Sequence, residues 1–513
     1  MAGDNASLYA LMEENFPADR NRIAMEIPER GGTAWSFDDL SSGAGRYAAL
    51  IASLGLKKGD RVAVQVEKSP EALLVYLACL RGGFAFMPMN TAYRADEVAY
   101  LVGNAGPALV ICDPAREGEI AEIAERQSGA RVLTLDAEGK GSLADAVAAH
   151  GLGELSPVPC APDDLAAILY TSGTTGKPKG AMLSHRNLAS NGLALREAWR
   201  FTAKDILLHA LPIFHAHGLF VACHCALLSG ARMIWLQKFD RERVLAELPR
   251  ATVFMGVPTF YTRLLAGEGL DVETVRNMRL FTSGSAPLLA ETFDAFRART
   301  GHAILERYGM TETGMNTSNP YDAERRAGTV GFALPGTEIR VTDDADNPLP
   351  RSETGGLQVR GPNVFSGYWR MPEKSAEEFA AGGWFRTGDV ARVDEDGYVH
   401  LVGRAKDLII SGGYNVYPKE IEEIVDDMPE VDESAIVGVP HADFGEAGVA
   451  LVVLRQGASL DEAALLARLK ERLANYKVPK RVFFVEELPR NTMGKVQKNL
   501  LRDEYRDACR SVA

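Results

Sequence analysis

The sequence is poor in several features that mark specialised protein classes. Its 513 residues include six cysteines, too few for a disulfide framework in a chain of this length. No strongly basic stretch offsets the formal net charge of -13, so nucleic acid is not expected as a partner. An anionic ligand would therefore need a locally positive site within a negative molecule.

Export and membrane signals are also missing. The first twenty residues show no basic start followed by an apolar core and a cleavage site, which argues against a signal peptide. The most apolar long stretch, HGLFVACHCALLSGARMIWL, is interrupted by two histidines and one arginine, which suits a buried helix and strand better than a membrane span. The last residues, RSVA, match no lipidation or organelle tag. We expect a cytoplasmic protein that does not bind membranes.

The sequence gives little evidence for a metal site built from cysteine and histidine. Cys223 and Cys225 flank His224, but no second pair of ligands follows at a suitable distance, so ordinary buried cysteines are the simpler interpretation.

The chain shows an α/β pattern, which gives way to short strands without intervening helices toward the C-terminus. Short apolar runs alternate with amphipathic helical stretches, which predicts βαβ units and a largely parallel sheet. From about Gly328, short glycine-punctuated strands predict a small antiparallel subdomain over 328–405. The remainder, 406–513, resembles an independent α+β unit of ordinary domain size. We therefore predict a large domain at 1–405 and a small one at 406–513, with a hinge near Arg404.

One loop stands out chemically. In AAILYTSGTTGKPKGAMLSH, residues 166–185, a strand is followed by a run of Thr, Ser, Gly and Lys. Glycines let backbone N–H groups approach phosphate oxygens, and the hydroxyls and lysines add donors and charge. The run is not a Walker A loop, because the first glycine position falls on Thr171 and Pro178 follows the lysine. A flexible surface turn is the alternative on the loop alone.

The string YTSGTTGKPKG resembles the signature of the adenylate-forming superfamily, which includes acyl-CoA synthetases, peptide-synthesis adenylation domains and firefly luciferase. ERYGMTET, GWFRTGD, GRAKDLIISGGYNVYPKEIE and PRNTMGKVQK follow in the family's order, so the resemblance covers essentially the whole chain. It implies that a carboxylate attacks the α-phosphate of ATP to give an acyl-adenylate and pyrophosphate, and that a thiol then displaces AMP. ATP, Mg²⁺ and coenzyme A would be required, with 1–405 as the AMP-binding domain and 406–513 as a mobile lid.

The resemblance also assigns roles to residues of these segments. Glu312 would bind Mg²⁺ through a hard carboxylate oxygen, and Thr171 would contact both the metal and the nucleotide. Asp389 would accept the ribose hydroxyls. The other nucleotide-binding positions that it implies are Ser172, Gly173, Thr174, Thr175, Gly176, Lys179, Ser285, Ala286, Glu306, Arg307, Tyr308, Met310, Thr311 and Arg404.

Two catalytic poses are implied as well. Lys495, in the NTMGK loop, would meet the attacking carboxylate and the α-phosphate in the first step. Lys406 would then act as the pivot about which the lid rotates. The rotation would bring Gly412, Gly413 and Tyr414 to line the thiol channel, so that domain alternation lets one site serve adenylation and thioesterification.

The acid must be inferred from the pocket. His215 resembles the family histidine that gates the CoA tunnel and borders the acyl site, and Met310 belongs to the same pocket. Arg263 interrupts a helix that other synthetases line with apolar side chains, and a guanidinium in a pocket suits a second carboxylate. With Ser285 beside it, the chain resembles the malonyl-CoA synthetase branch. Ala216 stands where that branch often carries Thr, which would leave room for the methyl group of methylmalonate as an additional substrate.

Other interpretations remain open at this point. Arg263 could instead point outward to a surface acid, which would leave a CoA ligase for another short-chain or aryl acid. A peptide-synthesis adenylation domain lacks support, because no convincing Asp for a substrate amine is found. A non-catalytic nucleotide-binding relative is disfavoured, because Glu312, Asp389 and Lys495 are all present. The enzyme is expected to be a monomer or a homodimer that acts on small molecules.

Overall fold

The structure of this protein, a computed structural model, describes residues 6–149, 151, 153–171, 178–411, 414–441, 444–473, 475–491 and 494–509. The chain forms two compact units. The first comprises Met1–Glu338 and Val359–Phe385, and the second comprises Ile339–Gln358 and Arg386–Ala513. The chain therefore passes from one unit to the other three times. None of the helices within the described ranges has the length and apolar character needed to cross a membrane.

A nine-stranded sheet forms the centre of the first unit. In spatial order its strands are β15 (Phe332–Ala333), β14 (Gly314–Ser318), β13 (Leu305–Met310), β12 (Leu280–Ser283), β11 (Val253–Gly256), β9 (Ile206–His209), β10 (Arg232–Trp235), β1 (Ile23–Ile27) and β2 (Thr33–Ser36). All neighbours from β13 to β1 are parallel. Parallel strands buried on both faces carry continuous apolar runs, and this is the pattern from which the parallel sheet is predicted.

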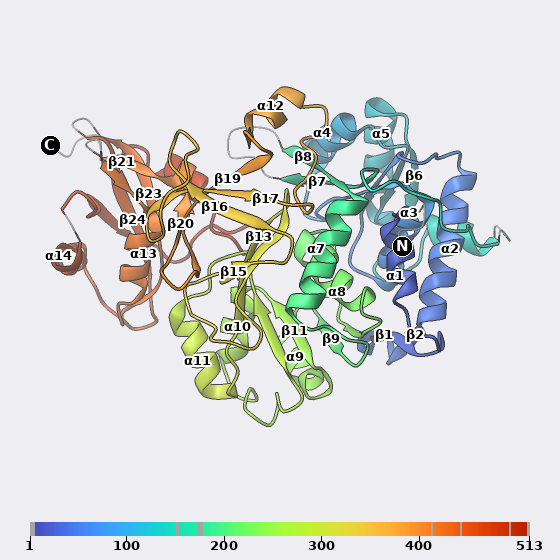
Figure 1. The fold of residues 1–513 in the computed structure, drawn as a ribbon, viewed down its shortest axis with the longest axis horizontal. Helices are drawn as coiled ribbons and strands as arrows, with labels where there is room; N and C mark the ends of the chain where they lie inside the picture. The colour runs from blue at the N-terminus through green and yellow to red at the C-terminus, as the bar shows by residue number, and fades with distance from the viewer. Residues whose placement is uncertain are drawn as a thin grey trace. The chain divides into compact units, whose positions relative to one another are not determined.

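Both faces of this sheet are covered by helices (Figure 1). These are α7 (His185–Ala198), α8 (His224–Leu227), α9 (Arg241–Glu247), α10 (Pro258–Leu265) and α11 (Ala290–Thr300), with a π-helical turn, η3 (His217–Cys223), before α8 and a 3₁₀ turn, η4 (Leu248–Arg250), after α9. Side chains alternate between the faces of a strand. Phe254 and Phe281 accordingly join the core beneath α10 and α11, whereas Val253 and Leu280 join the core that contains α7 and α8.

A six-stranded sheet completes the first unit. Its spatial order is β6 (Arg131–Thr134), β5 (Leu109–Cys112), β3 (Arg61–Gln65), β4 (Ala85–Pro88), β7 (Leu165–Thr171) and β8 (Lys179–Ser184), of which only the last pair is antiparallel. The accompanying helices are α1 (Leu8–Glu14), α2 (Phe37–Ser53), α3 (Pro70–Gly82), α4 (Ala95–Ala105), α5 (Glu117–Gln127) and α6 (Ser142–Ala149), with 3₁₀ turns η1 (Pro28–Arg30) and η2 (Pro114–Arg116).

Helix α3 shows how local sequence sets an element's ends. The Ser69 hydroxyl accepts a hydrogen bond from the Ala72 N–H, and Pro70 stands at the first helical position, where its missing N–H is not needed. Gly83 ends the helix in a left-handed conformation, with φ +70°, which glycine adopts without strain. The segment SPEALLVYLACLRGG thus forms one of the helices of the alternating pattern.

Antiparallel strands occupy the region where the chain changes unit. They are β16 (Glu338–Thr342), β17 (Thr354–Arg360), β18 (Phe379–Ala380), β19 (Trp384–Val393) and β20 (Val399–Arg404), with helix α12 (Pro372–Glu377) before β18 and the 3₁₀ turn η5 (Ala405–Asp407) after β20. In the first unit β18 pairs with the start of β19, and in the second unit β19 pairs with β20. The antiparallel strands predicted within 328–405 are therefore present. The boundary between the compact units, however, does not fall at 405.

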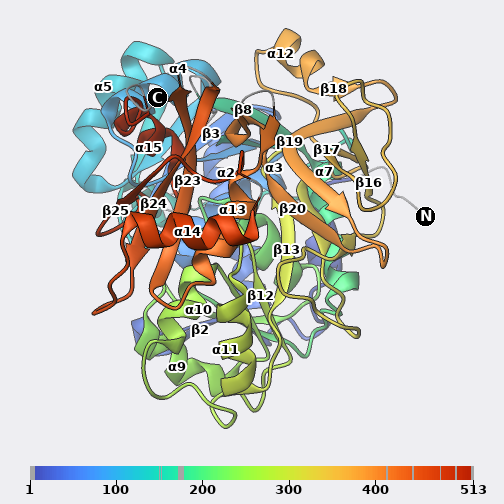
Figure 2. The same ribbon diagram turned by 90° about the vertical axis from the view of Figure 1, so that its left-hand side faces the viewer.

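The C-terminal part of the second unit is an α+β layer. Its strands run in the order β22 (Tyr414–Val416), β21 (Ile409–Ser411), β24 (Gly445–Leu454) and β23 (Val431–His441), with β25 (Arg481–Phe484) beside β24, and its helices are α13 (Pro418–Asp426), α14 (Glu462–Arg472) and α15 (Lys498–Glu504). Ile436 on β23 packs into the core with α13 and α14, and Val437 packs into the core with α15. Figure 2 shows α13 and α14 across one face of this sheet.

The α/β fold class is confirmed. The predicted buried helix and strand in HGLFVACHCALLSGARMIWL are found as η3, α8 and β10, and Cys223 and Cys225 are fully buried. The compact units group 339–358 and 386–405 with the C-terminal layer. The functional division at 405, with a hinge at Lys406, stays a prediction.

Candidate active site

The predicted site residues of the first unit gather at the carboxyl ends of its parallel strands. In the sheet register Gly256 lies beside Ser283, and Ser283 lies beside Glu306. The segments that follow β11 and β12 and the last residues of β13 are therefore neighbours. In open α/β sheets ligands bind at this edge.

Ser285 has an unusual backbone. Its φ is +72°, a left-handed conformation that costs a non-glycine residue about 1–2 kcal/mol. Its hydroxyl lies 3.2 Å from Nδ1 of His217. Burial and then the nearby charge of Arg307 hold the pKa of His217 well below its usual value, so this imidazole is neutral. A serine kept in strained backbone at a strand end is typical of a functional position.

Arg307 on β13 is the buried cation of this edge. Only 3% of the residue is exposed, and its Nε and Nη2 groups have no hydrogen-bond partner among the described residues. A methyl group on Gly284 would lie 2.5 Å from the Arg307 Cζ atom, so the guanidinium packs directly against that glycine. Burial lowers the pKa of Arg307 to about 10, which leaves the group charged at neutral pH.

Arg263, the predicted carboxylate partner, is placed differently. Helix α10 buries Tyr261 and Leu264 and leaves Thr262 and Arg263 exposed. The backbone carbonyl of Arg263 accepts a hydrogen bond from Arg241. The amphipathic helix thus turns the Arg263 side chain away from the core of the first unit, and its assignment to the acyl pocket stays a prediction. The cation enclosed beside Ser285 is Arg307.

The residues around Arg307 on β13 have distinct surroundings. Glu306 is buried and accepts a hydrogen bond from the Leu288 N–H at 3.1 Å, which ties the turn after β12 to β13. Tyr308 is buried as well, and its hydroxyl lies 4.0 Å from the sulfur of Met310. Among the other predicted residues, Ala286 and Met310 are partly buried.

Glu312 follows β13 and is buried, with 5% exposure. Its Oε1 atom accepts a hydrogen bond from the Tyr368 hydroxyl at 3.0 Å. A carboxylate held in this way offers the hard oxygen that Mg²⁺ prefers, so the donor chemistry fits the predicted metal role.

The phosphate-loop prediction is described only at its two ends. Ser172, Gly173, Thr174, Thr175 and Gly176 lie outside the described residues. Thr171 ends β7 and pairs in register with Lys179 on β8. The Lys179 ammonium lies 3.4 Å from Glu378 and 4.1 Å from the centre of the Tyr368 ring.

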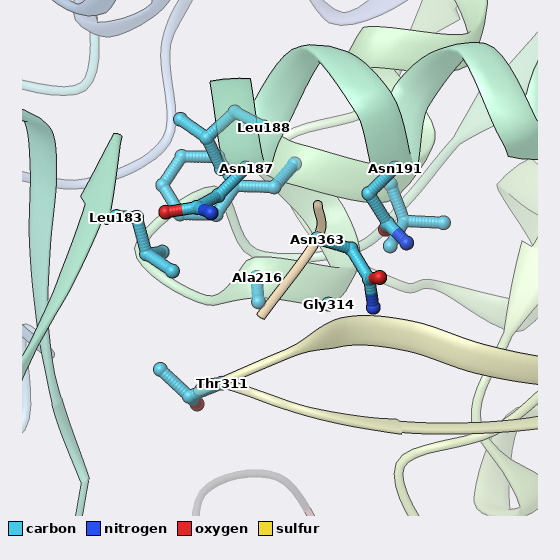
Figure 3. A pocket seen from close by; sticks show the side chains of 10 residues that line it. Leu183, Asn187, Leu188, Asn191, Ala216, Thr311, Gly314 and Asn363 are labelled. Carbon is cyan, nitrogen blue, oxygen red and sulfur yellow. The ribbon is translucent and has the colours of Figure 1, made fainter. Parts of the chain in front are cut away.

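A pocket in the first unit joins predicted acyl and nucleotide residues (Figure 3). It is lined by Leu183, Asn187, Leu188, Asn191, Ala216, Phe220, Val221, Thr311, Gly314 and Asn363. The Asn187 amide donates to the carbonyls of Pro362 and Val364, both at 2.8 Å. The first turn of α7 is thereby fixed against the segment that carries Asn363.

His215 precedes Ala216 and is partly buried. Its Nδ1 atom accepts a long hydrogen bond, 3.4 Å, from the His217 N–H. The three residues His215, Ala216 and His217 thus form one turn that enters η3, and the predicted gate and the Ser285 contact belong to the same short segment.

The second unit carries another set of predicted residues. Asp389 on β19 pairs in register with Arg404 on β20, and their side chains form an ion pair at 2.6 Å. Asp389 is 5% exposed. The Arg404 guanidinium thus holds the Asp389 carboxylate in a fixed position, which suits a residue that binds ribose hydroxyls.

Lys495 belongs to this set. It is exposed, and its backbone N–H donates to the Asn491 side chain at 3.0 Å. Desolvation by the surrounding protein, followed by the charge of Arg404, lowers the pKa of Lys495, while Asp389 opposes the shift. Lys406 is exposed nearby in η5 and contributes to the same field.

The predicted thiolation face is described in part. Gly412 and Gly413 lie outside the described residues, and for Tyr414 the backbone alone is described, as the first residue of β22. Their roles stay predictions.

Comparison with known proteins places the chain in a family. Residues 12–369 match the family described as AMP-binding enzyme, and residues 420–495 match the AMP-binding enzyme C-terminal domain. The chain belongs to the AMP-binding enzyme family. The resemblance drawn from its motifs is thereby confirmed.

Similar proteins cover almost the whole of this AMP-binding enzyme. The crystal structure of ATP-bound MatB from Rhodopseudomonas palustris superposes with a TM-score of 0.96 at 55% identity, over 99% of this chain and 100% of that one. Feruloyl-CoA synthase from Amycolatopsis sp is 36% identical over 96% of this chain and 98% of its own length. Malonate–CoA ligase from Arabidopsis thaliana is 35% identical, with 98% and 90% covered. Overall identity therefore does not distinguish between the acids named for these last two relatives.

Proposed function

We propose that this AMP-binding enzyme joins malonate to coenzyme A, with ATP converted to AMP and pyrophosphate. Methylmalonate is a second substrate in this proposal. The observation that carries it is the buried guanidinium of Arg307, whose Nε and Nη2 groups have no partner among the described residues, beside Gly284 and Ser285.

The cost of burying a charge favours an acid with two carboxylates. An unpaired guanidinium in the interior is unfavourable by several kcal/mol, and its planar fork matches a carboxylate in two parallel hydrogen bonds. A malonate bound with one carboxylate at Arg307 keeps the other for reaction. An aryl or alkyl acid would leave Arg307 unpaired. This argument, and not sequence identity, favours malonate, because a feruloyl-CoA synthase and a malonate–CoA ligase are about equally similar to this chain.

The reaction proceeds in two displacements. A carboxylate oxygen of the acid attacks the α-phosphorus of ATP, and pyrophosphate leaves. The thiol of coenzyme A then attacks the acyl carbonyl, loses its proton, and AMP leaves. Both partners of the first displacement are anions, so the chain's contribution is to neutralise charge and to align the attacking oxygen.

The residues divide this work between the two units. In the first unit, Lys179 and Thr171 flank the phosphate loop, and His215 borders the route of the thiol. Glu312 would hold Mg²⁺, which screens the charge of the phosphates when it is bound. In the second unit, Asp389 accepts the ribose hydroxyls and Lys495 acts in the first displacement.

Ala216 supports the second substrate. The residue is buried and lines the pocket of Figure 3 together with Thr311. An alanine leaves more space there than a threonine would, so a methyl branch on carbon 2 of malonate has room.

The test is AMP release in the presence of ATP and coenzyme A across acetate, propionate, malonate, methylmalonate, succinate and benzoate. We expect kcat/KM to be highest for malonate, with methylmalonate next and the monocarboxylic acids far behind. A higher kcat/KM for benzoate or propionate would contradict the proposal and would favour a ligase for another short-chain or aryl acid.

A further inference from the structure

A lysine is buried in the first unit behind the turn that carries His217. Lys68 is 6% exposed and lies between β3 and α3. Its ammonium contacts Nδ1 of His209 at 2.7 Å, the carbonyl of His209 at 2.9 Å and the carbonyl of Leu236 at 2.6 Å. It also lies 4.3 Å from the centre of the Trp235 ring. A lysine ammonium has three donors, and all three are used.

These contacts are made without a counter-ion. Among the described residues, no carboxylate lies within ion-pair distance of Lys68, and the attraction of Glu29 is felt only at longer range. Burying a lysine without a carboxylate is costly. A methionine of similar length would fill the space without that cost, so the ammonium has a role beyond packing.

The ammonium fixes the state of His209. Burial lowers the pKa of Lys68 to about 7. In its protonated form the ammonium can only donate, so Nδ1 of His209 accepts and the ring proton sits on Nε2. That atom lies 2.8 Å from the carbonyl of Gly218, to which it donates. The ring is stacked on Trp235, with 4.8 Å between centroids and 23° between planes. Its orientation is therefore held from three sides.

Gly218 links this network to the acid site. It directly follows His217, whose ring contacts Ser285 at 3.2 Å. A methyl group on Gly218 would lie 2.0 Å from the Pro212 carbonyl, so the turn from Pro212 to Gly218 is tightly closed. The Gly218 carbonyl has little freedom to move without moving His217.

We propose that Lys68 is a positioning residue of the acid site: by fixing the Nε2–H tautomer of His209, it anchors the Gly218 carbonyl and holds His217 where it meets Ser285. This inference deepens the proposed function and rests on it only for the identity of the acid. The other titratable groups that face the network are Cys223, 3.4 Å from the His209 ring, and Glu29. Burial raises the pKa of Cys223 to about 12, so the thiol stays protonated.

The first experiment uses the wild-type protein. ¹⁵N NMR of the histidine-labelled enzyme should show His209 as the neutral Nε2–H tautomer, assigned by loss of its signals in His209→Phe. An Nδ1–H tautomer, or a charged ring, would overturn the proposal without any need for a lysine variant to fold.

The second experiment is a double-mutant cycle with the acid that the wild-type enzyme uses best. Lys68→Met and His209→Phe should each raise KM for the acid about fivefold or more, the loss expected for one buried hydrogen bond, with KM for ATP unchanged. The double variant should raise it no further than the larger single change. Lys58→Met removes an exposed lysine paired with Asp164 at 2.6 Å and serves as the control, with no change expected.

Independent, multiplicative effects would overturn the proposal, as would equal increases in KM for ATP and acid, because these indicate a general structural role. Since the cycle uses whichever acid is preferred, a preference for an acid other than malonate defeats the proposed function while leaving this test intact.

Discussion

At the scale of single residues, two arginines differ in burial: Arg263 is exposed, whereas Arg307 is buried. Arg263 and Arg307 are both visible in the sequence, and the family motif assigns Arg307 to the nucleotide. The pattern of α10 contains the signal for the exposure of Arg263, because apolar residues at 260, 261, 264 and 265 leave position 263 on the polar side. The burial of Arg307 was not predictable, because it depends on the pairing of β12 with β13 and on the close approach of Gly284.

Arg307→Met should discriminate between acids. The change removes the partner of the second carboxylate, so kcat/KM for malonate should fall at least about 30-fold, as expected for the loss of a charged hydrogen-bonded pair, while that for propionate changes little. The ratio is measured within one variant by AMP release, so partial unfolding cancels.

Arg263→Ala is the matched comparison, and unchanged kinetics with both acids in this variant would remove Arg263 from the acyl pocket to which the resemblance assigns it. Equal losses for malonate and propionate in Arg307→Met would instead assign Arg307 to the nucleotide, as the motif alone implies.

At the scale of elements, two helices of the first unit begin with the same device. Ser36 caps α2, and Ser184 caps α7. Each hydroxyl accepts from the backbone N–H three residues on, and each backbone N–H donates back to the side chain of Asp39 or Asn187. The two caps differ in what lies next to them, because the Asn187 side chain lines the pocket of Figure 3.

Ser36→Ala and Ser184→Ala should each lower the free energy of unfolding of the first unit by about 1 kcal/mol, measured by urea denaturation. Only Ser184→Ala should also reduce kcat/KM, since the freed first turn of α7 no longer fixes the pocket wall. If the cap of α2 affected activity as much as that of α7, stability alone would explain both changes.

Elements are also where the sequence is most informative. The apolar runs of β3, β9 and β11 and the capped helix α3 follow from local chemistry, because propensity, capping and burial agree there. The order of strands in the nine-stranded sheet is not accessible in this way, because β1 and β10 pair across some two hundred residues of chain.

At the scale of the whole molecule, the two displacements should be separable. Lys495→Ala should nearly abolish pyrophosphate exchange, which reports adenylate formation, while transfer of a preformed acyl-adenylate to coenzyme A stays largely intact. Lys470→Ala, at an exposed position on α14, should leave both activities unchanged. Equal loss of the two activities in Lys495→Ala would remove Lys495 from the first displacement.

The threefold passage of the chain between its compact units limits how the protein can be taken apart. A truncation after residue 405 would strip away the C-terminal layer yet retain 339–358 and 386–405, which belong to the same compact unit as that layer. Grafting the second unit onto another scaffold therefore means cutting at three junctions at once, and a single proteolytic nick would leave the halves threaded together.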